Sequence, residues 1–286
     1  MTDALPKVIT AVAQLRAEIA AIRRAGKMIA LVPSMGALHE GHLSLVRAAR
    51  RECDYTVVSI YVNPTQFGPN EDFAKYPRTL QSDLALLAGC QADAVFAPSN
   101  AEMYRPDHAT WVEVGPVAEP WEGTCRPGHF RGVATVVLKL LGMVQPDAAF
   151  FGQMDYQQSV VIRRMVADLD VPVTIRICPT VREADGLALS SRNRYLSPAA
   201  RQRALVLWQS LQLAGRMLSG GERRAEVIAG EMRKLIESAG DARVDYIALA
   251  DAETLQPIET VTGPTLAALA VRIETTRLID NCLLEP

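Results

Sequence analysis

The sequence predicts an α/β fold, with a parallel β-sheet covered by helices on both faces and a smaller C-terminal α+β domain. Several short runs are apolar throughout, and helical patterns lie between most of them. Strands of this kind that alternate with helices are typical of parallel sheets buried on both faces. After about Thr180 the chain becomes polar and rich in Gly, Ser and Arg, so we expect two domains, 1–180 and 181–286.

Composition is consistent with a globular protein of this size. The chain has 286 residues, 49% of them hydrophobic, and a net charge of −2, which gives no reason to expect a nucleic-acid or membrane partner. No apolar run approaches the ~20 residues of a membrane-spanning helix, and the first residues do not resemble a signal peptide. The five cysteines lack CxxC spacing, which indicates a reduced, cytoplasmic protein without a structural metal.

The first elements are expected to be a helix and a buried strand. Pro6 suits the first turn of a helix, and Gly26 is expected to end it. The apolar positions of this helix are Val8, Val12, Leu15, Ile19 and Ile22. The run MIALVP, residues 28–33, predicts a strand, and a second helix is expected to begin near Gly41.

Strands and helices then alternate to the end of the first domain. The expected strands are Tyr55–Val62, Asp93–Pro98, Ala148–Gly152 and Val173–Pro179, and the expected helices are Thr79–Gln91, Val133–Val144 and Gln157–Asp168. In the second domain we expect helices at Pro198–Leu218 and Glu222–Ser238, then strands within 244–258 and 265–281, with turns at Asp251–Glu253 and Gly263–Pro264. Parallel sheets bind ligands at the carboxyl ends of their strands.

The stretch VPSMGALHEGH, residues 32–42, follows a predicted strand and contains two of the four histidines. A helix N-terminus attracts phosphate, and Gly36 and Gly41 permit close approach to the backbone. His39 and His42 can donate to phosphate oxygens or protonate a leaving oxygen. A metal site is the first alternative, but HExxH spacing is absent and no third ligand stands in an obvious motif. The second alternative is a structural role for both histidines. The position of the stretch, after a strand and at the start of a helix, favours phosphate binding over both alternatives.

Two further stretches carry candidate binding groups. VNPTQFGPNEDFAKYPRT, residues 62–79, is a polar loop after a strand, where Asn63 and Gln66 suit hydroxyls and a carboxylate. An ordinary turn with a solvated glutamine fits it equally well. LALSSRN, residues 187–193, offers two hydroxyls and an arginine for a polyphosphate, although this is also common loop composition.

Together with FFGQMDYQQ, residues 150–158, these stretches resemble the pantothenate synthetases, a family of ATP-dependent ligases with a Rossmann-like nucleotidyltransferase domain. The resemblance is collinear from about residue 5 to 200. It implies that Mg-ATP activates (R)-pantoate to pantoyl adenylate with release of pyrophosphate, and that β-alanine then displaces AMP to give pantothenate. It also implies a homodimer, with ATP as co-substrate carrying Mg2+ and no metal held by the protein alone.

The resemblance assigns site residues as follows. His42 is the expected proton donor, and His39 is expected to contact the phosphates. Arg192 is the third expected catalytic residue. The ATP-binding residues are Met35, Gly36, Ala37, Leu38, His39, Glu40, Gly41, His42, Gly152, Gln153, Met154, Asp155, Val181, Leu189, Ser190, Ser191 and Arg192. The substrate-binding residues are Gln66, Gln158, Met35, Asn63 and Arg126. Tyr76, Asp83 and His129 also fall in matching segments.

Met154 is the one departure from the family's pattern, which reads Gly-x-Lys-Asp at this place. Methionine fills the space of the lysine without its charge, so we expect adenylation to be slowed ~10²–10³-fold, as on loss of one preorganised donor. Met154 is then a replacement in an otherwise normal enzyme, a natural divergence compensated by another cation such as Arg126 or Arg192, or a sign that only ligand binding remains.

Three other functions stay open. Another nucleotidyltransferase of the HxGH type would leave the nucleotide on its product instead of releasing AMP. A ligand-binding relic would bind ATP and pantoate without turnover, even with lysine at position 154. A metal-dependent hydrolase would retain its metal through dialysis.

Overall fold

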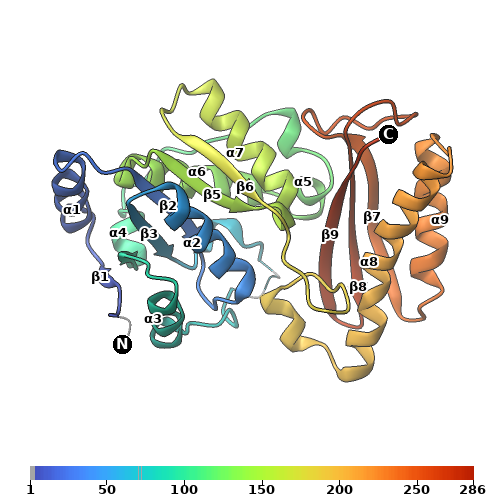
Figure 1. Ribbon diagram of the computed structural model, residues 1–286, viewed down its shortest axis with the longest axis horizontal. Coiled ribbons are helices and arrows are strands. Elements are labelled where there is room, and N and C mark those ends of the chain that lie inside the picture. Colours follow the sequence, from blue (N-terminus) through green and yellow to red (C-terminus); the bar gives the residue numbers. More distant parts are fainter. Residues whose placement is uncertain (1–3, 70, 72) are drawn as a thin grey trace. The chain divides into compact units, whose positions relative to one another are not determined.

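The computed structural model describes residues 4–69, 71 and 73–286. The chain divides into two compact units, the first ending at Pro179 and the second running from Thr180 to Pro286. Each unit has its own sheet, and both are drawn in Figure 1.

The first unit contains a six-stranded sheet with the strand order β1-β4-β3-β2-β5-β6. Every pair of neighbouring strands in it is parallel, which confirms the predicted sheet. The strands are β1 (Lys7–Ile9), β2 (Ile29–Ser34), β3 (Tyr55–Ile60), β4 (Ala94–Phe96), β5 (Ala148–Gly152) and β6 (Thr174–Cys178). The helices are α1 (Val12–Arg24), α2 (Glu40–Glu52), α3 (Leu80–Gly89), α4 (Asn100–Met103), α5 (Glu122–Cys125), α6 (His129–Val144) and α7 (Tyr156–Asp168), with short 3-10 turns η1 (Pro64–Gln66), η2 (Pro116–Ala118) and η3 (Gln153–Asp155).

Both faces of this sheet are covered by helices, as the continuously apolar strands predict. In β2, Ile29 and Leu31 pack on one side with residues of α1, α6 and α7. The alternate residues Ala30 and Val32 pack on the other side with residues of α2 and α3. Because successive side chains of a strand point to opposite faces, one apolar run supplies both cores.

The expected start of the first helix is wrong. Residues 7–9 form β1, which pairs with β4, and α1 begins only at Val12. Ile9 is buried while Val8 is exposed, so these two residues alternate as in a strand and do not share a helix face. The β-branched residues that follow Pro6 favour the extended pairing over the helical turn that we expected.

The second unit contains the antiparallel sheet β7-β8-β9 with two helices packed on it (Figure 1). Its elements are η4 (Ser191–Tyr195), α8 (Pro198–Ser219), α9 (Ala225–Glu237), β7 (Ala242–Asp251), β8 (Thr265–Ile273) and β9 (Thr276–Leu284). The turn between β8 and β9 lies inside the stretch 265–281 and was not expected. Glu274 takes a positive φ of 52° there without the Gly or Asn that usually marks such a turn.

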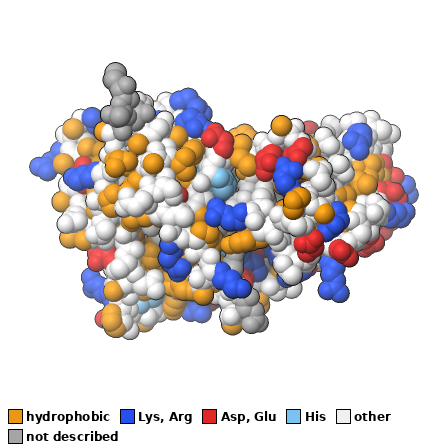
Figure 2. All heavy atoms as spheres, turned by 90° about the horizontal axis from the view of Figure 1, so that it is seen from below, with side chains coloured by type: hydrophobic (Ala, Val, Ile, Leu, Met, Phe, Trp, Pro, Cys, Tyr) orange, Lys and Arg blue, Asp and Glu red, His pale blue; other side chains and the backbone are white. Residues whose placement is uncertain are grey.

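Charged side chains of both signs are interspersed over the face shown in Figure 2, in keeping with the small net charge. Within the described ranges, no helix combines the length and the apolar character needed to cross a membrane. All five cysteines are free thiols.

Candidate active site

The carboxyl ends of β2, β3 and β5 are neighbours in the sheet, because β2 lies between the other two strands. From β2 the chain continues to β3 and β4 on one side and later to β5 and β6 on the other. Parallel sheets bind ligands where the strand order diverges in this way. Three predicted segments begin at these strand ends: 35–42 after β2, 61–66 after β3 and 153–158 after β5.

The loop between β2 and α2 is fixed by the buried carboxylate of Asp83. Its two oxygens accept hydrogen bonds from the backbone N–H groups of Ala37 at 3.1 Å and Leu38 at 2.9 Å. Gly36 has a φ of +82°, and a Cβ atom there would lie 3.0 Å from Ile60 and 3.1 Å from Asp83. Glycine is therefore needed at position 36, and Asp83 acts by holding the loop.

His39 is the N-cap residue of α2, and His42 stands in the first turn. The two rings lie 4.1 Å apart between centroids. The backbone N–H of His39 donates to Nδ1 of His42 at 3.4 Å, so a neutral His42 carries its proton on Nε2. Burial, and next the nearby His39, lower the pKa of His42 to about 3. The ring is thus a neutral donor at the start of a helix whose dipole favours anions.

The side chains of Asn63 and Gln66 are hydrogen-bonded to each other. Asn63 is the N-cap residue of η1, and Gln66 is its last residue. The amide nitrogen of Asn63 donates to Oε1 of Gln66 at 3.1 Å and to the carbonyl oxygen of Gly132 at 3.2 Å. The oxygen of Asn63 accepts from the Tyr104 hydroxyl at 3.1 Å, and the side chain is buried. Gln66 in turn donates to the sulfur of Met35 at 3.3 Å. Asn63 therefore orients Gln66, and Gln66 links the loops after β2 and β3.

Arg126 is tied to the same loop through an acidic residue and a histidine. Its Nε and Nη2 donate to the two oxygens of Glu71 at 2.8 and 2.7 Å. Its Nη1 lies 3.1 Å from Nε2 of His129, whose Nδ1 lies 2.8 Å from the carbonyl oxygen of Gln66. Because a guanidinium only donates, His129 accepts on Nε2 and donates through Nδ1.

Ionisation in this network follows from burial and charge. Burial, and then the charge of Arg126, lower the pKa of His129 to about 4, which agrees with a neutral ring. Burial would raise the pKa of Glu71, but the hydrogen bonds and charge of Arg126 outweigh it and bring the pKa below its ordinary value. The result is a compensated ion pair that holds the backbone of Gln66 through His129.

The predicted residues after β5 lie on η3 and on the first turn of α7. Met154 and Gln158 are partly exposed, and Asp155 is exposed. Gln157 is instead buried, and its amide nitrogen donates to the carbonyl oxygens of Val117 at 3.1 Å and Pro120 at 2.8 Å. Of the two adjacent glutamines, Gln157 therefore serves the fold, and Gln158 is the one with a side chain available to a ligand.

The remaining predicted residues, Val181 and 189–192, belong to the second unit. The N–H of Leu189 donates to the carbonyl oxygen of Val181 at 3.0 Å, and the Ser190 hydroxyl accepts from the N–H of Arg192 at 3.2 Å. Residues 181–189 thus form one compact turn that brings the predicted adenine and phosphate residues together.

This turn is anchored by Arg182, which sequence reasoning missed. Its guanidinium donates to both oxygens of Asp280 at 2.7 and 2.8 Å and lies 3.7 Å from the centroid of the Trp208 ring. Gly186 has a φ of +96°, and a Cβ atom there would lie 2.1 Å from Trp208. Asp280 is 98 residues away in sequence, so no local pattern reveals the pair.

The role of Glu71 was also missed, although it lies inside the quoted loop 62–79. Its partner Arg126 is 55 residues away.

Among the described residues, no group of three or more His, Cys, Asp or Glu side chains is placed to hold a metal ion.

The chain is similar to known proteins over nearly its whole length. A family model described as Pantoate-beta-alanine ligase matches residues 7–283. The chain is 55% identical over 279 residues to a pantothenate synthetase of Moorella thermoacetica, covering 98% of this chain and 99% of the relative. A second such relative, from Roseiflexus sp., is 54% identical over 279 residues with the same coverage.

Solved structures give the same result for the fold. A pantothenate synthetase structure from Thermus thermophilus superposes with a TM-score of 0.93 at 46% identity, covering 98% of this chain and 100% of that one. A pantoate-beta-alanine ligase from Francisella tularensis, in complex with a β-γ ATP compound and β-alanine, gives a TM-score of 0.80 at 34% identity and covers 97% of both chains.

Proposed function

The chain belongs to the pantoate-beta-alanine ligase family, and from this we infer that it is an ATP-dependent ligase that joins pantoate to β-alanine to give pantothenate. The observation that carries this inference is the family match over residues 7–283, which includes every segment at the strand ends described above. The buried Asp83 that fixes the loop before α2 adds physical support, because it shapes a helix N-terminus suited to phosphate.

The reaction has two steps. A carboxylate oxygen of pantoate attacks the α-phosphorus of ATP, the bond to the bridging oxygen of pyrophosphate breaks, and pantoyl adenylate forms. The amine of β-alanine then attacks the acyl carbon, the bond from this carbon to the AMP oxygen breaks, and one proton leaves the nitrogen. Both steps require alignment of the reacting groups and exclusion of water from the anhydride.

In the first unit, the loop 35–41 and the start of α2 would hold the ATP phosphates, with His39 among the contacts. His42 would donate through Nε2–H, the nitrogen left with the proton once Nδ1 accepts from the backbone of His39. Incoming phosphate charge favours the protonated imidazole, so the low pKa of about 3 in the ligand-free protein would rise on ATP binding.

Pantoate would bind to Gln66, Gln158 and Met35. The contact between Gln66 and Met35 supports this assignment, since it places two of the three groups together. Asn63 and Arg126 would then act by positioning Gln66, because their side chains are occupied by protein groups. Gly152 to Asp155 would line the nucleotide.

The second unit, the smaller C-terminal domain, would contribute ATP-binding residues of its own. Val181 would meet adenine through its backbone, and residues 189–192 would contact the phosphates, with Arg192 offsetting charge in adenylation. The turn held by Arg182 and Asp280 supports this by fixing Val181 and Leu189 relative to each other. We further propose that ATP carries Mg2+, that the chain forms a homodimer and that it works in the cytoplasm; light scattering of the purified protein tests the dimer.

The function is tested by supplying ATP, pantoate and β-alanine and analysing the products. We expect AMP and pyrophosphate in equal amounts with pantothenate, and pantoate-dependent exchange of pyrophosphate into ATP without β-alanine. A product that keeps the nucleotide would instead identify a nucleotidyltransferase with another acceptor. Binding of ATP and pantoate without exchange, both in this chain and in Met154→Lys, would identify a relic.

A further inference from the structure

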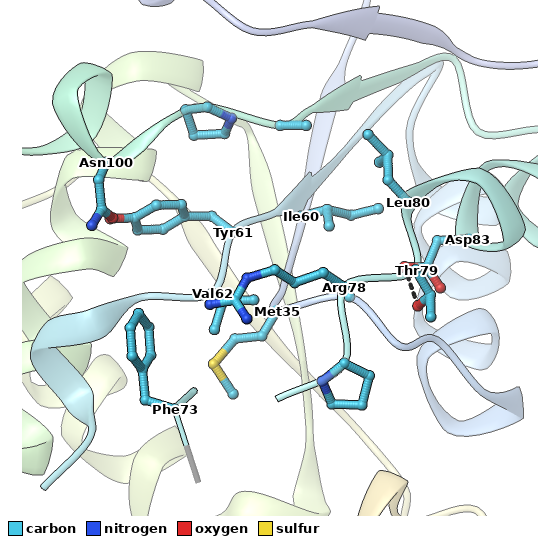
Figure 3. A pocket seen from close by; sticks show the side chains of 14 residues that line it. Met35, Ile60, Tyr61, Val62, Phe73, Arg78, Thr79, Leu80, Asp83 and Asn100 are labelled. Atoms are coloured by element: carbon cyan, nitrogen blue, oxygen red, sulfur yellow. Dashed lines mark hydrogen bonds between the residues drawn. The ribbon is translucent and has the colours of Figure 1, made fainter. Parts of the chain in front are cut away.

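The thioether of Met35 lies at a cavity of about 380 Å³, at the carboxyl ends of β2, β3 and β4 in the first unit. Figure 3 shows the side chain reaching into this cavity, with the sulfur directed toward Phe73. Met35 is partly exposed, whereas the next two residues, Gly36 and Ala37, are buried. The cavity has room for several molecules of the size of water, so a small solute can reach the sulfur.

The same sulfur accepts a hydrogen bond from the side chain of Gln66. Nε2 of Gln66 donates to it at 3.3 Å. Oε1 of Gln66 accepts from the amide nitrogen of Asn63 at 3.1 Å, so the amide group of Gln66 is held at both ends. A thioether sulfur is a weak acceptor with two lone pairs, and the hydrogen bond to Gln66 uses one of them. The other lone pair remains available for reaction.

Exposure divides the methionines of the described residues into two groups. The buried ones are Met103, Met143, Met165 and Met232. Met28 is 46% exposed, but it precedes β2 and so lies at the other end of that strand from Met35. Met154 and Met217 are partly exposed, and Met217 belongs to the second unit. Met35 is thus an accessible methionine whose sulfur is bonded to a proposed substrate residue.

We propose that Met35 is a redox-modification site, at which hydrogen peroxide converts the thioether to a sulfoxide and so weakens pantoate binding; the inference rests on the proposed function. A lone pair of the sulfur attacks one oxygen of the peroxide, the O–O bond breaks and an S–O bond forms. The departing hydroxide takes up the proton of the transferred oxygen and leaves as water. The sulfur loses the two electrons that the peroxide gains. Methionine sulfoxide reductases reverse the change with a dithiol, which becomes a disulfide as the oxygen leaves in water.

The sulfoxide cannot keep the contact that Met35 makes with Gln66. Its oxygen is a stronger acceptor than the sulfur and takes an N–H donor at about 2.9 Å. This oxygen and its bond to sulfur would have to fit between two atoms that lie only 3.3 Å apart, so Met35 and Gln66 must separate. Gln66 then leaves the position in which Asn63 orients it, and a polar group takes the place of the thioether.

The test treats the purified chain with hydrogen peroxide and then with dithiothreitol, which restores reversibly oxidised cysteines and leaves methionine sulfoxide in place. Peptide mass spectrometry measures the fraction of sulfoxide at each methionine. Pantoate-dependent exchange of pyrophosphate into ATP gives the KM for pantoate. We expect this KM to be at least ~5-fold higher once Met35 is oxidised, as on loss of a hydrogen bond. Treatment with the reductases MsrA and MsrB should restore the original KM.

Three variants identify the sulfur that is responsible, each compared with its own untreated protein. Met35→Leu keeps an apolar side chain of similar volume that peroxide does not oxidise, so peroxide should change its KM by less than about twofold. Met28→Leu is the matched control, because it removes a more exposed sulfur outside the cavity lining. Met28→Leu and Met154→Leu should both stay as sensitive to peroxide as the unchanged chain.

Four results would overturn the modification site while the proposed function stands. They are an unchanged KM in protein with oxidised Met35, a Met35 that stays reduced while Met28 is oxidised, sensitivity that persists in Met35→Leu, and sensitivity that disappears in Met154→Leu. Where Met35→Leu has no activity to compare, recovery under the reductases must follow the loss of sulfoxide at Met35, and recovery that does not follow it overturns the site. Failure of the untreated chain to form pantothenate overturns the proposed function itself, and this inference with it.

Discussion

Met154 stands on η3, two residues after the end of β5, and is partly exposed and uncharged. A lysine is expected at this position from the family pattern, and another cation would have to replace its charge if activity is full. Arg126 is a poor replacement, since both of its donor edges face Glu71 and His129 and its charge is already compensated. Arg192 belongs to the second unit and is the remaining candidate named by the sequence.

Met154→Lys should therefore raise the rate of pantoate-dependent pyrophosphate release at least tenfold. A fixed charge that meets the phosphates in the transition state contributes ~10²–10³-fold in comparable sites, which sets the upper limit. The rate is measured with saturating ATP and pantoate on protein shown to be folded by circular dichroism. Met154→Leu, which changes shape but adds no charge, is the control and should leave the rate unchanged. Equal rates in the Lys and Met proteins would contradict the hypothesis that adenylation is slowed by the missing charge at position 154.

At the level of elements, α6 and η1 form the support of Gln66. The N-terminal residue of α6 is His129, which contacts the carbonyl oxygen of Gln66. One turn later Gly132 packs directly against η1, because a Cβ atom there would lie 2.3 Å from the carbonyl oxygen of Thr65 and 2.7 Å from the nitrogen of Gln66. The proposed substrate glutamine is thus placed by backbone contact between two elements.

Gly132→Ala should displace η1, since the atoms that it meets are backbone and cannot rotate away. We expect a loss of about 1–3 kcal/mol in the free energy of unfolding, as for overpacking of a core, and a higher KM for pantoate. Gly142→Ala is the matched control on the same helix, because nothing lies within 4 Å of its added Cβ atom. That change should be neutral or stabilising by up to about 1 kcal/mol. Denaturant titration and pantoate kinetics of both proteins check this, and equal behaviour of the two would contradict the contact.

The same support makes stability depend on pH. The pKa of His129 in the folded protein is about 4, below the ordinary value of 6.5, so the unfolded chain binds more protons between these values. Stability therefore falls as pH decreases from about 6.5 toward 4. Between pH 7 and 5 the contribution is on the order of 1–2 kcal/mol. His129→Asn removes the titrating ring and keeps an amide donor, so its denaturation midpoint should shift less over this range. An identical shift in both proteins would show that other groups control the acid sensitivity.

Over the whole molecule, the structural features that depend on residues close together in the sequence were the predictable ones. Apolar runs gave the strands of the sheet, and quoted motifs gave the segments at its carboxyl edge. One error came where long-range pairing decided the outcome, because residues 7–9 became a strand by pairing with β4. The other was local, because the chain turns between β8 and β9 at Glu274 without a typical turn residue. The partners Glu71–Arg126 and Arg182–Asp280 are separated by 55 and 98 residues, so a single sequence cannot reveal them.

The two units have separate cores, since one cluster draws its residues from 187–284 and the other two from 9–178. A defect placed in one core is therefore expected to act locally. Asp280 is 3% exposed and pairs with Arg182, which holds the turn 181–189. Burial raises the pKa of the Asp280 carboxyl, although the hydrogen bonds and the charge of Arg182 act in the opposite direction. The charged form of Asp280 therefore depends on its contacts with Arg182.

Asp280→Asn should leave the guanidinium of Arg182 without its counter-charge and destabilise the second unit by about 3 kcal/mol. Hydrogen exchange should then accelerate in amides of 180–286 and stay unchanged in 4–69. Affinity for ATP should fall as well, because Val181 and Leu189 lose their fixed spacing. Glu231→Gln breaks an exposed pair with Lys234 in the same unit and serves as the control, with an expected effect below about 0.5 kcal/mol. Faster exchange spread evenly over both units would show that the chain unfolds as one cooperative body, and the local account of the ATP turn would then be wrong.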